Sequence, residues 1–253
     1  MKERLGEINK NKFGTEMKII AYRKSNDIDV QFLDKDGYIF KHQIYANFKS
    51  GGIKNPYDKN MCGVGYMGVG KYHCKHTNGV HTIEYQNWIA MIRRCYDEKR
   101  KDTYSSYYGT CEVCSEWHNF QVFGQWYEQN FYQVGTERMH IDKDILIHGN
   151  KIYSPETCII VPQRINMMFM NKPNKRGLPN GIVQYKSGYL AKYNHQQLGI
   201  YPTVELAYEA YSNEKEKAIK ELAETYKNII PKRVYDALYA YKFDIRNDRN
   251  YVA

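Results

Sequence analysis

The sequence predicts an α+β protein. Its parts are a small β-rich N-terminal module, a helical connector, a hairpin–helix unit, and a C-terminal three-stranded sheet with a helix. Three patterns predict this order. Residues 17–45 alternate between apolar and polar side chains around an Asp-Gly turn, as β-hairpins do. Residues 84–97 carry apolar side chains at helical spacing. Residues 139–171 and 181–226 each run through short strands into a helix.

Length and composition restrict the class of protein. The chain has 253 residues, of which 42% are hydrophobic and 15% aromatic, with 25 Tyr. This composition excludes a disordered chain and allows one large domain or two to three small ones. No apolar run approaches the roughly 18 residues of a membrane span, and no secretory signal is recognised. We therefore expect a cytoplasmic protein whose six Cys are free thiols or metal ligands rather than disulfides.

Positive charge gathers at the two ends of the chain. The formal net charge is +9, made up of +6 (14 − 8) over 1–80, −2 (9 − 11) over 81–171 and +5 (14 − 9) over 172–253. Basic surfaces attract nucleic acid through its phosphates, so a nucleic acid is the partner that the charge predicts. The alternative is an ordinary solubility charge. A linker of Pro, Asn, Gly and charged residues at 172–180 predicts that a C-terminal domain begins at 181.

Two helices are predicted in the connector. Trp88, Met91, Ile92 and Cys95 form one apolar stripe of the first helix. A second helix is predicted over 118–131, where aromatic side chains recur. Such aromatic residues are more often core than a binding surface, and we expect a core here.

Two motifs in this part of the chain are weak signals. The run Gly63-x-Gly65-x-x-Gly68 lacks the preceding strand and following helix of a dinucleotide site, so it predicts a glycine loop. The pair Cys111-x-x-Cys114, with His118 behind it, has zinc-ligand spacing, and His73, Cys74 and His76 could complete a site. We favour two small buried thiols over structural zinc because a second Cys-x-x-Cys pair is missing.

The residues around 140–166 carry the clearest chemistry. Hydrolysis of a phosphodiester needs a divalent ion on the scissile phosphate and a base that activates water. Hard oxygen ligands such as Asp and Asn suit Mg²⁺ or Mn²⁺. A β-hairpin followed by a helix can supply both, and the chain offers Asp142 on a strand and Asn166 on a helix 24 residues later.

The run from Met139 to Asn166, MHIDKDILIHGNKIYSPETCIIVPQRIN, resembles the HNH, or ββα-metal, endonucleases of bacteriophages, in particular their homing-endonuclease-like subgroup. Residues 48–57, 88–96 and 114–121 are also similar to that subgroup, so the likeness covers most of the chain. The resemblance implies a ββα-metal domain within 81–171 that hydrolyses DNA with a divalent metal.

Carried over by position, the resemblance makes Asp142 and Asn166 metal ligands and Asn150 the loop residue that braces the hairpin. The general-base His of the wider family is replaced by Lys143. A Lys acts as a base only where burial or nearby positive charge lowers its pKa. His140 and His148 are the nearby substitutes. The alternative is a degenerate site, in a regulatory or counter-defence protein that binds DNA without cutting it.

The C-terminal residues 181–211 resemble the Apetala/ethylene-response-factor type of DNA-binding domain, most clearly in LGIYPTVELAYEAY. The resemblance implies that double-stranded DNA is the partner and that 181–253 lays a three-stranded sheet into its major groove with a helix packed behind the sheet. We expect Val204, Ala207 and Tyr211 to face the sheet. The predicted DNA-binding residues are Gln184, Tyr185, Lys186, Tyr189, Lys192, Tyr193, Arg164, Lys175 and Arg176. The alternative is a generic α+β interaction module.

Overall fold

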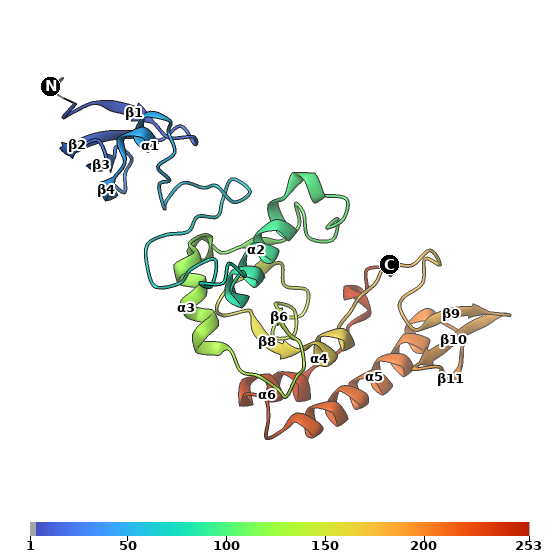
Figure 1. Cartoon of the computed structure of the whole chain (residues 1–253). Helices are drawn as coiled ribbons and strands as arrows, with labels where there is room; N and C mark the ends of the chain where they lie inside the picture. The colour runs from blue at the N-terminus through green and yellow to red at the C-terminus, as the bar shows by residue number, and fades with distance from the viewer. Residues whose placement is uncertain (1–3, 253) are drawn as a thin grey trace. The chain divides into compact units, whose positions relative to one another are not determined.

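The computed structural model describes residues 4–252 (Figure 1). The fold is α+β, as the sequence predicts, and divides into two compact units. The first unit extends to Gln129 and the second begins at Asn130. Across the described residues, no helix combines the length and the apolar character that a bilayer-crossing helix needs.

The first unit begins with an antiparallel sheet. Its strands are β1 (Ile8–Lys10), β2 (Glu16–Lys24), β3 (Asp27–Phe32) and β4 (Ile39–Gln43), which lie in sequence order. Helix α1 (Tyr45–Lys49) follows, and its Phe48 is buried with apolar side chains of β2 and β3. Along β3 every second residue is buried, which is the period-2 pattern of a sheet that covers a core on one face.

The rest of the first unit is helical. Its elements are α2 (Ile83–Tyr96), a 3-10 turn at Glu98–Arg100, β5 (Glu112–Val113), a 3-10 turn at Ser115–His118, and α3 (Phe120–Asn130). The Thr82 hydroxyl accepts the Tyr85 N–H and so caps α2. The expected aromatic core is confirmed: the Trp88 ring lies 5.3 Å from Phe120 and donates its N–H to the Trp117 carbonyl at 2.7 Å.

The glycine-rich residues 63–70 form a loop, as expected. Gly68 has a φ of +65°, and a Cβ built on it would lie 2.2 Å from the Asn119 side chain. Its backbone N–H donates to the Pro56 carbonyl, and Tyr66 exchanges backbone hydrogen bonds with His118 and Phe120. The glycines therefore allow the loop to approach the chain that leads into α3.

The second unit begins with the hairpin–helix part. Strands β6 (Met139–Asp142) and β8 (Ile159–Pro162) pair antiparallel, and α4 (Gln163–Met168) follows β8 directly. The short strand β7 (Ile152–Tyr153) lies in the connecting segment. Strand β6 ends at Asp142, because the Asp142 side chain accepts the backbone N–H groups of Asp144 and Ile145 and turns the chain.

The second unit continues with a sheet and two helices. Strands β9 (Ile182–Tyr185), β10 (Gly188–Tyr193) and β11 (Gln196–Tyr201) form an antiparallel sheet with β10 in the centre. Helix α5 (Val204–Tyr226) is capped by Thr203, and α6 (Lys232–Ala240) and a 3-10 turn at Ile245–Asn247 follow. Figure 1 shows α5 extending from this sheet to α6.

The division into units differs from the expected domains 1–80, 81–171 and 181–253. Helix α5 packs its first half against the C-terminal sheet through Ala207 and Tyr211. Its second half shares a core with the hairpin–helix part, where Ile219 and Tyr226 lie with Val161 and Ile165. One 23-residue helix therefore joins two parts that the sequence separates at the linker.

The linker 172–180 is held by the C-terminal tail. The Asp248 carboxylate accepts the backbone and side-chain N–H groups of Asn180, each at 3.0 Å. The Asn250 side chain accepts the Asn174 N–H at 2.8 Å and donates to the Lys172 carbonyl at 3.0 Å. These hydrogen bonds fix a segment whose composition is that of a flexible linker.

Candidate nuclease-like site

Asp142 ends strand β6 and caps the loop that follows. Its Oδ1 accepts the backbone N–H of Asp144 at 2.7 Å and that of Ile145 at 2.8 Å. Its Oδ2 accepts no hydrogen bond from the described residues, and therefore remains available as a hard oxygen ligand. Burial, and then the neighbouring Asp144, raise the pKa of Asp142 from its ordinary 3.8 to about 6.

Lys143 is buried, with 4% of its side chain exposed. Its ammonium donates to both carboxylate oxygens of Asp144, at 2.8 and 2.9 Å, and to the Asn150 carbonyl at 2.7 Å. Three acceptors stabilise the charged amine, whereas a general base needs an unprotonated amine with a free lone pair. The geometry therefore does not fit the predicted role of Lys143 as the base, and indicates that Lys143 holds the loop together.

Asn150 lies where the resemblance implies a brace. Its Nδ2 donates to the Lys143 carbonyl at 2.9 Å and to the Ile152 carbonyl at 2.6 Å, and its Oδ1 accepts the Ile152 N–H at 3.2 Å. One side chain thus connects the end of β6 to the start of β7. This position makes Asn150 a structural residue of the hairpin rather than a group that contacts reacting atoms.

Asn166 contacts His140 rather than Asp142. Its amide Nδ2 lies 3.1 Å from the His140 Nδ1. His140 and Asp142 are two residues apart on β6, so their side chains leave the same face of the strand. Helix α4 packs against β6, which brings Asn166 to this face. The structure therefore brings Asn166 into contact with His140, and the sequence alone does not indicate this contact.

His148, the second substitute base, packs among aromatic side chains of the second unit. Its ring is 5.2 Å from the Tyr241 ring and 6.3 Å from Phe243. Burial lowers its pKa below the ordinary value. Its neighbours make it part of an aromatic cluster of the second unit.

We expect the Asp142 carboxylate to cost stability. Its folded pKa near 6 exceeds the ordinary 3.8, so the folded protein binds the proton more tightly than the unfolded chain does. The free energy of unfolding should therefore fall by on the order of 3 kcal/mol as the pH rises from about 4 to 6 and Asp142 ionises. Asp142→Asn should be more stable than wild type at pH 7.5 but not at pH 4. Urea unfolding in EDTA tests this, with exposed Asp102→Asn as the control; equal behaviour of both variants would contradict it.

The C-terminal sheet divides the predicted DNA-binding residues between its two faces. Tyr189 and Tyr193 pack against the core under the sheet, and the Tyr193 ring lies 6.0 Å from Tyr211 of α5. Gln184 pairs with Tyr189 across the strands and so leaves the sheet on the same face. Tyr189 and Tyr193 are therefore partly covered by α5, whereas Gln184 is exposed although it leaves the sheet on the helix side.

The opposite face carries the remaining candidates of this sheet. Lys192 alternates with Tyr193 along β10, and Tyr185 alternates with Gln184 along β9, so both point away from α5. Lys186 lies exposed in the turn between the strands, with its ammonium 5.4 Å from the Tyr185 ring centre. Arg164 on α4 and Lys175 and Arg176 in the linker are also exposed. These six side chains are therefore accessible to a ligand.

The cysteine and histidine side chains that could have formed a zinc site do not come together as a group of three ligands within residues 4–252. The one group of three potential ligands that lies close together there is Asp27, Asp29 and His42. The Arg23 guanidinium pairs with both carboxylates of that group, so a cationic side chain already neutralises it. His118 instead contacts the Val113 carbonyl at 3.1 Å through its Nε2.

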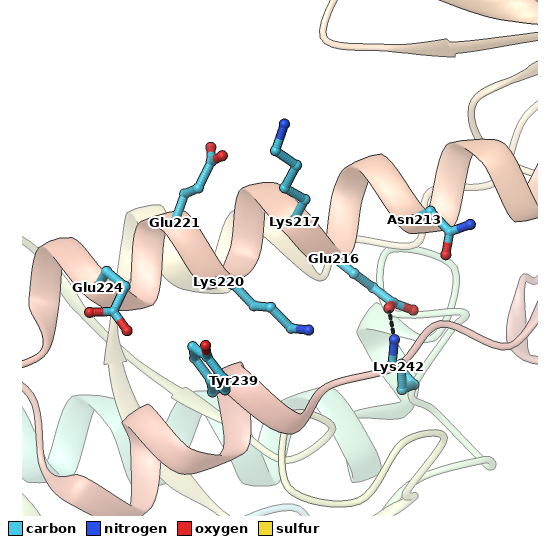
Figure 2. A pocket seen from close by; sticks show the side chains of 8 residues that line it. All are labelled: Asn213, Glu216, Lys217, Lys220, Glu221, Glu224, Tyr239 and Lys242. Carbon is cyan, nitrogen blue, oxygen red and sulfur yellow. Dashed lines mark hydrogen bonds and ion pairs between the residues drawn. The ribbon is translucent and has the colours of Figure 1, made fainter.

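A surface hollow of about 370 Å³ lies between α5 and α6. Figure 2 shows Lys220 and Tyr239 at its centre and the ion pair of Glu216 with Lys242 at one end. Its charged lining is balanced between three Lys and three Glu: Lys217, Lys220, Lys242, Glu216, Glu221 and Glu224. Such a lining does not favour a phosphate backbone.

Comparisons with family models, with curated proteins and with solved structures found no match.

Proposed function

We propose that the protein is an HNH-type DNA endonuclease or nickase that hydrolyses phosphodiesters with a divalent metal ion. The observation that supports the proposal most is the contact between Asn166 and His140 beside Asp142. The imidazole of the hairpin and the amide of the helix that directly follows it are in contact, and Asp142 leaves the same strand as His140 two residues later. The proposal places the protein in the cytoplasm of a bacterial host, encoded by a phage.

The side chains on this face suit Mg²⁺ or Mn²⁺. Asp142 Oδ2 would hold the ion, which commonly takes one or two carboxylates together with substrate phosphate and water. The Asn166 oxygen is the second predicted ligand. When bound, the ion would stabilise negative charge on the scissile phosphate and on the leaving oxygen.

His140 is the general base of this proposal, in place of Lys143. A half-turn of the Asn166 amide presents its oxygen, rather than its nitrogen, to His140 Nδ1. An imidazole that carries its hydrogen on Nδ1 uses its other nitrogen, Nε2, to accept a proton from water. In this arrangement Asn166 is a positioning residue for His140, and Asp142 is the principal ligand.

The second candidate function is DNA binding without cleavage. It is favoured by Lys143, which stands in the sequence where the resembled endonucleases have their general-base His. The Lys143 ammonium donates hydrogen bonds to Asp144 and to the Asn150 carbonyl. Plasmid nicking with Mg²⁺ or Mn²⁺, against an EDTA control, separates the two functions. Metal-dependent nicking supports the nuclease; binding that persists with no nicking in either metal supports the second function.

The outer face of the C-terminal sheet should contact DNA in this proposal. Lys192→Ala and Lys186→Ala should each weaken duplex binding several-fold and reduce the slope of log K against log salt by about one, because each removes one phosphate contact. Tyr193→Phe is the matched control on the helix-facing side and should bind as wild type does. Fluorescence anisotropy at several salt concentrations measures both quantities. Unchanged slopes for the two Lys variants would exclude this face from the interface.

A further inference from the structure

Lys215 is a buried cation without a protein acceptor. It lies on α5 with 9% of its surface exposed. Within the described part of the chain its ammonium makes no hydrogen bond or ion pair; it lies 4.4 Å from the centre of the Phe243 ring and 5.5 Å from that of Tyr211. An ammonium removed from water without an acceptor is unfavourable, so an additional group is expected beside it.

The ammonium lies at a small cavity of about 30 Å³. The two rings that Lys215 faces both line the cavity, together with Tyr208, Tyr241 and His148. The hydroxyls of Tyr208, Tyr211 and Tyr241 likewise have no hydrogen-bond partner among residues 4–252. The cavity is thus surrounded by four groups that can donate hydrogen bonds and lack an acceptor.

The carboxylate that lines the cavity does not supply that acceptor. Asp248 Oδ2 accepts two N–H groups of Asn180, and its Oδ1 accepts two of Asn250, at 2.9 to 3.0 Å. Its hydrogen-bonding capacity is therefore largely used by the linker and the tail. The negative charge of Asp248 favours the charged form of Lys215 without a hydrogen bond to it, so the cavity still lacks a direct acceptor for its donors, and an anion would supply one.

We propose that this cavity binds one small inorganic anion of halide size, held by the Lys215 ammonium and the surrounding tyrosine hydroxyls. One water molecule needs roughly 10–15 Å³ of such space, so a cavity of about 30 Å³ can hold a small ion but not a nucleotide. Burial lowers the pKa of Lys215 to about 8, and a bound anion would keep the amine protonated. The ion would link α5, the chain after α6 and the loop that carries His148, and so stabilise the second unit.

The test uses the full chain and bromide. Melting is measured in sodium bromide and in sodium gluconate at equal ionic strength, and a crystal grown with bromide is measured at the bromine absorption edge. Wild type and the exposed-site control Lys217→Met should melt about 3–6 °C higher in bromide at ten times its dissociation constant, and Lys215→Met should lose this difference. An anomalous bromine peak in the wild-type cavity is expected. A cavity that holds water and gives no bromine peak would overturn the proposal. An equal rise of the melting temperature in bromide for Lys215→Met would also overturn it. If Lys215→Met does not fold, the crystal result decides.

Discussion

Removal of residues 172–253 is expected to unfold the hairpin–helix part. The core around Val161 and Ile165 contains seven buried residues from the removed segment: Ile219, Leu222, Ala223, Tyr226, Ile230, Val234 and Leu238. Losing even one large core side chain costs about 2–5 kcal/mol, against a total stability of about 5–15 kcal/mol. A protein truncated at 171 should therefore lose cooperative unfolding in this part. This expectation reverses the one that the linker suggests from sequence.

A cut between Gln129 and Asn130 is the matched comparison. It falls at the boundary of the two compact units and leaves the shared core of the second unit intact. The fragment 130–253 should unfold cooperatively, while 81–171 should not. Circular dichroism and urea unfolding of both fragments measure the difference. A folded 81–171 fragment would show that α5 is dispensable to the hairpin, contrary to the core described above.

His140→Ala should lose cleavage by about 10²–10⁴-fold, the usual scale for a general base. The melting temperature should change little, because His140 is partly exposed. Lys143→Met should behave in the opposite way: it leaves the half-exposed Asp144 carboxylate and the Asn150 carbonyl without this donor, so it should lower stability more than cleavage per folded molecule. Nicking rates and melting temperatures of the two variants test the two roles together.

Asn166 provides a rescue experiment for the same site. Asn166→Ala removes the side chain that faces His140 and should lose cleavage, whereas Asn166→Asp can accept the imidazole N–H and should retain part of the rate and its pH profile. If His140→Ala cleaves DNA while Lys143→Met is folded but inactive, Lys143 and not His140 is the general base. Inactivity of wild type in every metal would favour DNA binding without cleavage.

Much of the architecture could be predicted from local patterns. Period-2 alternation predicted the N-terminal strands, and helical spacing predicted α2, in which Trp88, Met91, Ile92 and Cys95 are buried as expected. The C-terminal three-stranded sheet and the helix that follows it were also predicted. These features depend on neighbours within a few residues, which the sequence states directly.

The sequence by itself determined the α+β class, the order of the elements and the presence of Asp142, Asn150 and Asn166 in one hairpin–helix segment. Only the tertiary structure decided how these side chains are used. It placed Asn166 beside His140, bound the Lys143 ammonium to Asp144 and the Asn150 carbonyl, and turned Tyr193 toward α5. The physical reason is that a contact between elements depends on packing over long sequence separations, and no local pattern shows which side of a strand a later helix will cover.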